Sequence, residues 1–236
     1  MKTRNFLLVL TVIILFFVLS ACKVIDLVSQ TLSGGEGTPY PTYTFYPTYI
    51  PNAAKESTGN NTSSDFTYTQ GMTMGDPNAP VKVIEFADYQ CPWCQYYALN
   101  MEPDFISQYV DQGFVYYTVS PMAFIGQESV DAALASYCAN DQGKFWEYRN
   151  ELFINLNGEN EGYYSIENLV SYASNSGLDQ GKFQVCLSAG EHQTDLNTAE
   201  DFADQLGVNS TPSFWVNGVV VSANDLNSAV EDALQN

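Results

Sequence analysis

Short apolar runs and longer amphipathic stretches alternate through the C-terminal two thirds of the chain. Residues 81–86 form a β-branched apolar run that predicts a buried strand. A helical stretch follows to about Val110, with a kink expected at Pro103. Residues 114–119 predict a second apolar strand. We therefore expect a strand–helix–strand unit with parallel strands and a right-handed crossover.

The next part of the chain is predicted to be helical. Its expected helices cover residues 129–138, 144–156, 166–175, 179–187 and 194–206.

The C-terminal segment has the pattern of a hairpin followed by a helix. Asn217-Gly218 separates two β-branched and aromatic runs, 214–216 and 219–221, which is a strong signal for a tight turn. A final helix is expected to extend to about Leu234. The order of elements favours an α/β fold in which helices interrupt a sheet.

The N-terminus has the pattern of an export signal. Lys2 and Arg4 precede an apolar run of about 14 residues, whereas a membrane-spanning helix needs roughly 20. The run ends in Ser20-Ala21-Cys22, which resembles the lipobox of bacterial lipoproteins, where cleavage precedes a lipidated cysteine. We expect residues 1–21 to be a lipoprotein signal peptide and Cys22 to carry lipid. The alternative is an uncleaved signal anchor, and both place the remainder outside the cytoplasm.

Residues 22–64 are rich in Pro, Thr and Tyr and show neither helical nor strand periodicity. Proline favours extended backbone and blocks ladder pairing, so this segment is expected to be a tether. The folded domain is then expected to cover residues 65–236, with a helical insertion at about 126–190.

Composition narrows the classes of function. Apolar residues make up 45% of the chain and charged residues 15%, which is sufficient for a buried core. The net charge is −19, and loss of the leader would make it −21, so the clustered cations needed for nucleic-acid binding are absent. A single histidine and five cysteines argue against a zinc site with many ligands, and no metal or cofactor is expected.

The candidate chemistry lies in Cys91-Pro92-Trp93-Cys94, at a junction between a strand and a helix. Both sulfurs would lie in the first helical turn, where free N–H groups and the helix dipole stabilise a thiolate. Cys91 is expected to be the nucleophile and Cys94 its more buried partner, and Pro92 suits the first helical position. The alternatives are half of a zinc ribbon or an inert disulfide.

Residues from about 75 to 236 resemble the DsbA-like branch of the thioredoxin superfamily. The resemblance rests on the Cys-Pro-Trp-Cys motif after a strand and on Thr211-Pro212 before the terminal hairpin. It implies a thioredoxin-like fold with a helical insertion between the βαβ half and the C-terminal hairpin and helix.

The resemblance also assigns roles to residues distant from the cysteines. Glu85 matches the buried acid beneath the redox pair and would accept or relay a proton as Cys94 becomes a nucleophile. Pro212 matches a cis-proline that faces the disulfide. The backbone at Thr211 would pair with a substrate peptide, and Trp93 would shape the rim of the site. Glu85 at an exposed strand end and a trans Pro212 are the structural alternatives.

The remaining cysteines also acquire a role from the resemblance. Some family members carry a second disulfide in the inserted helices, so Cys138 and Cys186 are expected to form a structural bridge. The alternatives are free thiols or a second redox relay. His192 has no neighbouring nucleophile in the sequence and is expected at the surface.

Together with the expected lipidation at Cys22, the resemblance implies an extracytoplasmic, lipid-anchored thiol:disulfide oxidoreductase without a cofactor. Its substrates would be exported polypeptides that contain cysteine pairs, and a membrane partner would reoxidise it. The strongest oxidants of the family resemble Cys-Pro-His-Cys, and Trp93 in place of that histidine leaves the direction of catalysis open. Alternatives are an isomerase or reductase with the same site, or a non-catalytic peptide-binding lipoprotein.

Overall fold

The computed structural model describes residues 71–235 of the chain. The predicted leader, Cys22, the tether and residues 65–70 lie outside these residues, so the domain boundaries in that region remain predictions. Within the described part, no helix combines the length and the apolar character needed to cross a lipid bilayer.

A five-stranded mixed sheet forms the centre of the fold, with strand order β1-β3-β2-β4-β5. The central strand β2 (Val81–Asp88) runs parallel to β3 (Val115–Met122). On its other side β2 pairs antiparallel with β4 (Ser213–Val216), which forms a hairpin with β5 (Val219–Ser222). The two-residue strand β1 (Thr73–Met74) completes the other edge.

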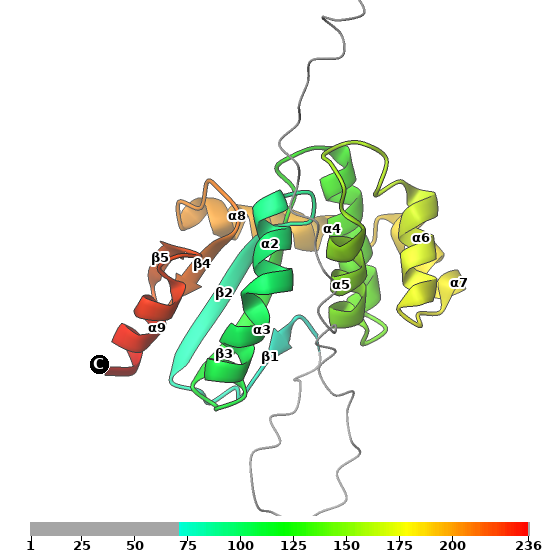
Figure 1. Cartoon of the computed structure of the whole chain (residues 1–236). Coiled ribbons are helices and arrows are strands. Elements are labelled where there is room, and N and C mark those ends of the chain that lie inside the picture. The colour runs from blue at the N-terminus through cyan, green and yellow to red at the C-terminus, as the bar shows by residue number, and fades with distance from the viewer. Residues whose placement is uncertain (1–70, 236) are drawn as a thin grey trace, which may run out of the picture. The chain divides into compact units, whose positions relative to one another are not determined.

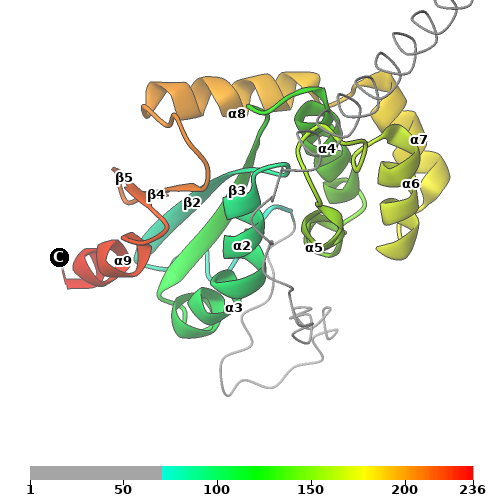
Figure 2. The same ribbon diagram turned by 45° about the horizontal axis from the view of Figure 1, so that its top comes forward.

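Helices cover both faces of this sheet. Figure 2 shows α8 (Gln193–Gln205) on one face and α2 (Pro92–Asn100), α3 (Glu102–Phe105) and α9 (Leu226–Gln235) on the other. A π-helical turn, Ile106–Val110, extends α3 toward β3. Apolar side chains alternate along the strands and supply a separate core to each helical layer.

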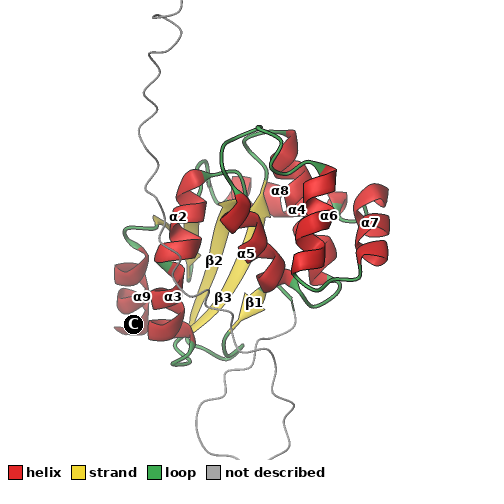
Figure 3. Cartoon of the chain, turned by 45° about the vertical axis from the view of Figure 1, so that its right-hand side comes forward, coloured by secondary structure: helices red, strands yellow, loops and turns green. Residues whose placement is uncertain are grey.

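The predicted insertion is a group of four helices between β3 and α8. They are α4 (Gln127–Asn140), α5 (Phe145–Asn155), α6 (Ile166–Asn175) and α7 (Gln180–Ala189). Figures 1 and 3 show α4, α6 and α7 grouped beside the sheet. These helices enclose a core of their own, to which Cys91 and Cys94 also contribute.

A disulfide joins Cys138 in α4 to Cys186 in α7, at a sequence separation of 48 residues. Both residues are buried. In the chain-entropy description, a closed loop of this length stabilises the folded state by about 4 kcal/mol. The bridge therefore fixes α7, the last helix of the insertion, to α4, the first.

The break between α2 and α3 falls slightly earlier than Pro103 predicts. α2 ends at Asn100, and α3 begins at Glu102 with Pro103 in its first turn. Proline is tolerated there because the first helical N–H groups have no intrahelical partner. Pro103 thus begins a new helix instead of kinking a continuous one.

Candidate active site

The segment before Cys91 is anchored by the buried carboxylate of Asp88, the last residue of β2. Its Oδ1 accepts hydrogen bonds from the Gln90 backbone N–H at 2.8 Å and from the Ser129 hydroxyl at 2.7 Å. Its Oδ2 accepts from the backbone N–H groups of Phe124 at 2.7 Å and Ile125 at 3.1 Å. One side chain therefore joins the turn into the active site to the loop that enters the insertion.

Cys91 occupies the N-cap position of α2, and Pro92 lies in the first helical turn. Its sulfur lies 3.3 Å from the carbonyl oxygen of Thr211, a residue 120 positions later in the chain. The Thr211–Pro212 peptide bond is cis. The cysteine pair and the segment before the hairpin thus meet at one site, and Cys91 and Cys94 are both free thiols.

The two cysteines differ in acidity. A hydrogen bond from the Cys94 thiol is the largest influence on Cys91 and lowers its pKa to about 6, although partial burial opposes this. The side-chain hydroxyl of Thr211 and the backbone N–H groups of Cys94 and Trp93 also donate to the Cys91 sulfur and lower its pKa. Burial raises the pKa of Cys94 well above its ordinary value. Cys91 is therefore the thiolate at neutral pH, and Cys94 remains its proton-bearing neighbour.

This asymmetry favours the reduced state of the pair. An unfolded cysteine has a pKa of roughly 8.5, so the lower pKa of Cys91 in the fold stabilises the reduced protein. The stabilisation is complete above pH ~8.5 and is lost as the pH falls through the folded pKa of about 6. A stabilised reduced form makes the corresponding disulfide a stronger oxidant.

The alkylation rate of Cys91 by iodoacetamide is expected to rise with a midpoint near pH 6, since only the thiolate reacts. Replacing Cys94 with alanine removes the main hydrogen-bond donor and should move this midpoint upward. Cys94→Ser is the matched control, because its hydroxyl retains a donor. Mass spectrometry of the reduced protein over a pH series measures both midpoints, and equal midpoints in the two variants would contradict the assigned cause.

A buried ion cluster lies beneath the cysteine pair. Glu85, in the middle of β2, is fully buried, and its Oε2 accepts from Arg149 Nη2 at 2.7 Å and from the Tyr117 hydroxyl at 2.8 Å. Arg149, in α5, also donates through Nη1 to Glu102 Oε2 at 2.7 Å. The insertion thus supplies the cation that pairs with two acids outside it, one in β2 and one in α3.

Burial is the largest influence on Glu85 and raises the pKa of its carboxyl to about 7, although Arg149 and Tyr117 act in the opposite direction. Its Oε1 atom is buried and has no hydrogen-bond partner within the described residues. A carboxyl with a pKa near neutrality exchanges protons readily at physiological pH. The negative charge of Glu85 also disfavours a thiolate at Cys94 and so raises the pKa of that thiol.

The rim of the site carries exposed aromatic side chains. Trp93 is 70% exposed and contacts the ring of Tyr96 edge to face at 6.1 Å between centroids. Phe124, in the loop anchored by Asp88, is also exposed. The ring of Trp93, two residues after Cys91, offers apolar contact area without a chemical role of its own.

Sequence reasoning missed two groups of functional residues. It did not single out Asp88, which anchors the turn, or Arg149 and Glu102, which complete the ion cluster. One signal pointed to Arg149, since it is the only arginine after the predicted leader. His192 was expected at the surface, but its side chain is only 17% exposed because it lies between Asp141 and Asp195.

Comparisons with known proteins agree with this geometry. Curated relatives of this chain include proteins named for disulfide bond formation. The "probable disulfide bond formation protein D" of Bacillus anthracis is 29% identical over 157 residues, which cover 65% of this chain and 72% of the relative. The "disulfide bond formation protein D" of Bacillus subtilis is 26% identical over 171 residues, covering 71% of this chain and 77% of the relative.

Solved structures share the fold. The oxidised BdbD of Bacillus subtilis superposes with a TM-score of 0.66 at 22% identity, covering 75% of this chain and all of that one. The DsbA of Chlamydia trachomatis superposes with a TM-score of 0.62 at 20% identity, covering 75% and 96% of the two chains. The predicted thioredoxin-like fold with a helical insertion is therefore confirmed.

A family model described as thioredoxin matches residues 67–236, which include the whole sheet, the insertion and the cysteine pair. This chain belongs to the thioredoxin family.

Proposed function

We propose that the protein is an extracytoplasmic thiol:disulfide oxidoreductase that oxidises cysteine pairs in exported polypeptides. The observation that carries this proposal is the acidic thiol of Cys91 at the N-terminus of α2, 3.3 Å from the Thr211 carbonyl oxygen. An inert disulfide in a peptide-binding protein would have no need for a lowered thiol pKa. The names of the two Bacillus relatives support oxidation as the direction of exchange.

In the proposed reaction a substrate thiolate attacks the sulfur of Cys91 in the Cys91–Cys94 disulfide. The bond between the two enzyme sulfurs breaks, and the electron pair leaves on Cys94. A second substrate thiolate then attacks the substrate sulfur of the mixed disulfide. The substrate gains a disulfide, and Cys91 departs as a thiolate, a good leaving group because its pKa is low.

Glu85 is the proton donor and acceptor for the Cys94 sulfur in this reaction. The departing Cys94 sulfur lies in an environment that raises its pKa, so it must be protonated as the disulfide opens. The Glu85 carboxyl has a pKa near 7 and an oxygen without a hydrogen-bond partner in the described chain. It donates this proton during oxidation of the substrate and accepts it when the pair is reoxidised.

The substrate polypeptide would bind across the segment before the hairpin. The Thr211 carbonyl oxygen lies 3.3 Å from the Cys91 sulfur, and the exposed Trp93 lies between the two cysteines in the sequence. An extended peptide can add backbone hydrogen bonds at Thr211 and apolar contacts at Trp93. A membrane-bound redox partner would then reoxidise the reduced pair.

An oxidative refolding assay tests this function. The oxidised full-length protein is mixed with reduced, unfolded ribonuclease A, and the recovery of nuclease activity is followed. Catalysed recovery, together with a Cys91–Cys94 pair that is mostly oxidised in cells, is expected. A pair kept mostly reduced in cells would assign the protein to the isomerase or reductase class instead. Absence of exchange in both directions would leave a peptide-binding lipoprotein.

We also propose that residues 1–21 are a cleaved lipoprotein signal, that Cys22 carries the lipid and that residues 22–64 tether the catalytic domain to the membrane. Replacing Cys22 with serine is expected to move the protein from the membrane fraction to the soluble extracytoplasmic fraction or the medium. Immunoblots of fractionated cells measure the shift, and metabolic labelling with a fatty acid should be lost in parallel. Retention of both signals in the variant would disprove lipidation at Cys22.

A further inference from the structure

The second disulfide lies in a cluster of metal-ligating groups that the proposed reaction does not use. The only histidine of the chain, His192, lies beside it at the start of α8. Its Nδ1 is 2.6 Å from Asp195 Oδ2, and its Nε2 is 2.8 Å from Asp141 Oδ2. Asp141 Oδ2 in turn lies 3.9 Å from the sulfur of Cys186. Asp141 Oδ2 therefore lies close to both the imidazole of His192 and the sulfur of Cys186.

The distances within this cluster suit a single small cation. One ligand atom each from Cys138, Cys186 and His192 lie within 4.8 Å of one another. In a tetrahedral zinc shell, bond lengths of about 2.0–2.3 Å place neighbouring ligand atoms roughly 3.3–3.8 Å apart. Once the bond between the two sulfurs opens, small side-chain rotations are sufficient to reach these separations. The two Cα atoms are 5.9 Å apart and need not move far.

We propose that reduction of the Cys138–Cys186 disulfide creates a binding site for a thiophilic divalent cation, with zinc as the cation of best fit. The ligands would be both thiolates, Nε2 of His192 and the carboxylate of Asp141. Two sulfurs, one imidazole and one carboxylate form a closed four-ligand set of the kind that zinc takes in structural sites.

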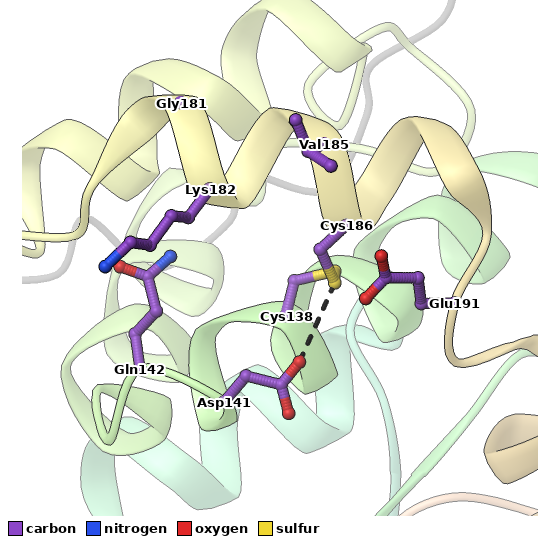
Figure 4. Close-up of a pocket in the computed structure, with 8 residues that line it drawn as sticks. All are labelled: Cys138, Asp141, Gln142, Gly181, Lys182, Val185, Cys186 and Glu191. Carbon is purple, nitrogen blue, oxygen red and sulfur yellow. Dashed lines mark hydrogen bonds between the residues drawn. A yellow bond between two sulfur atoms is a disulfide. The ribbon is translucent and has the colours of Figure 1, made fainter.

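The surroundings supply two further requirements of a metal site. A ligating histidine usually donates its other ring N–H to a carboxylate, which fixes the ring and its tautomer. Asp195 holds Nδ1 in this way and leaves Nε2 facing Asp141 and Cys186. A pocket of about 410 Å³ opens beside the disulfide, and Figure 4 shows the side chains of Asp141 and Glu191 flanking the sulfurs. The pocket provides an entry path for the cation.

The chemistry balances with a dithiol as the reductant. The dithiol transfers two electrons and two protons to the Cys138–Cys186 bond and becomes a disulfide itself. Zinc then displaces the two thiol protons as it binds. Because the same sulfurs cannot form both bonds, the disulfide and the metal are alternative cross-links between α4 and α7. The metal would keep the insertion closed in chains whose second disulfide has not formed.

Zinc binding to the full chain carrying Cys22→Ser, Cys91→Ser and Cys94→Ser tests this proposal, because Cys138 and Cys186 are then the only cysteines. The chain is reduced with a dithiol, freed of reductant without oxygen, and titrated with zinc chloride in competition with a chromogenic chelator. One equivalent of zinc is expected to bind the reduced chain and none the oxidised chain. These serines remove the proposed catalytic pair, so the outcome is independent of the proposed function.

Three further variants of this triple-serine chain distinguish a site with four ligands from zinc binding by the two thiols alone. His192→Ala removes a ligand and should weaken zinc binding most. Asp195→Asn should weaken it by about 10- to 100-fold, the usual effect of losing the partner of a ligating histidine. Asp201→Asn makes the same charge change on the same helix and should bind zinc like the parent.

Circular dichroism of each reduced variant, with and without zinc, shows whether folding is intact. If the reduced chain loses structure, added zinc should restore it in the parent and in Asp201→Asn, and Asp195→Asn should need more zinc. The proposal is overturned if the oxidised chain binds zinc equally well, if the reduced chain binds none, or if His192→Ala and Asp195→Asn match the parent.

Discussion

Cells that produce the Cys94→Ala variant are expected to accumulate covalent mixed disulfides between Cys91 and exported polypeptides. The Cys91 thiolate can still attack a substrate disulfide, which releases one substrate thiolate and leaves the other substrate sulfur bound to Cys91. In the unaltered protein the buried Cys94 lies one turn away and can release this adduct. Without that sulfur the adduct persists, so a species of very low abundance should become a major form of the protein.

Immunoblots of non-reducing gels, from cells treated with acid to stop exchange, measure these adducts. They should disappear when the sample is treated with a dithiol, and mass spectrometry should identify exported, cysteine-containing partners. The Cys91→Ser and Cys91→Ser/Cys94→Ala variants are the matched controls and should form none. Adducts of equal abundance in the double variant would mean that another cysteine makes the bond, which would refute the role given to Cys91.

Arg149→Met is expected to lower the free energy of unfolding by about 3–5 kcal/mol, the usual effect of removing one partner from a buried ion cluster. Arg149 is buried and bonds Glu85 and Glu102 at 2.7 Å each, so its loss leaves two carboxyl groups facing each other without a cation. Arg149 also lowers the pKa of Glu85, and its removal should raise that pKa further above 7. Urea unfolding measures the loss, and the pH dependence of ribonuclease refolding reports the change at Glu85.

The stability of two further variants is compared with that of Arg149→Met. Lys144→Ala breaks a partly exposed ion pair with Glu147 in the same helix and should change stability by about 0–1 kcal/mol. Adding Glu85→Gln and Glu102→Gln to Arg149→Met removes the unpaired acids and should restore part of the stability. If Arg149→Met is as stable as Lys144→Ala, the cluster does not hold the insertion to the core.

The sequence predicted the elements well where local signals were strong. The Asn217-Gly218 turn, the β-branched run of β2 and the periodicity of α6 each stand at the position expected from the sequence. The strand β1 was missed because its two residues are held by pairing with β3 and not by a pattern of their own. The spacing of the two cysteines located the redox pair and the resemblance located the Thr211-Pro212 segment, and the structure brings the two together.

The remaining features depend on contacts between distant segments. Nothing near Arg149 in the sequence indicates that it reaches Glu85, which lies 64 residues earlier. Similarly, the carboxylates that enclose His192 come from different helices, and only the packing of α4 against α8 brings Asp141 to it. Pairing of buried charges is decided by tertiary structure, so local sequence patterns give no access to it.

Asp88 has a consequence for how this molecule can change shape. Its carboxylate binds the turn that carries the nucleophile, the first helix of the insertion and the loop that precedes this helix. We therefore expect the catalytic turn and the near end of the insertion to move together. On the proposed function, adjustment to substrates of different size is then expected at Trp93 and at the far end of the helical group, away from the turn that positions the Cys91 sulfur.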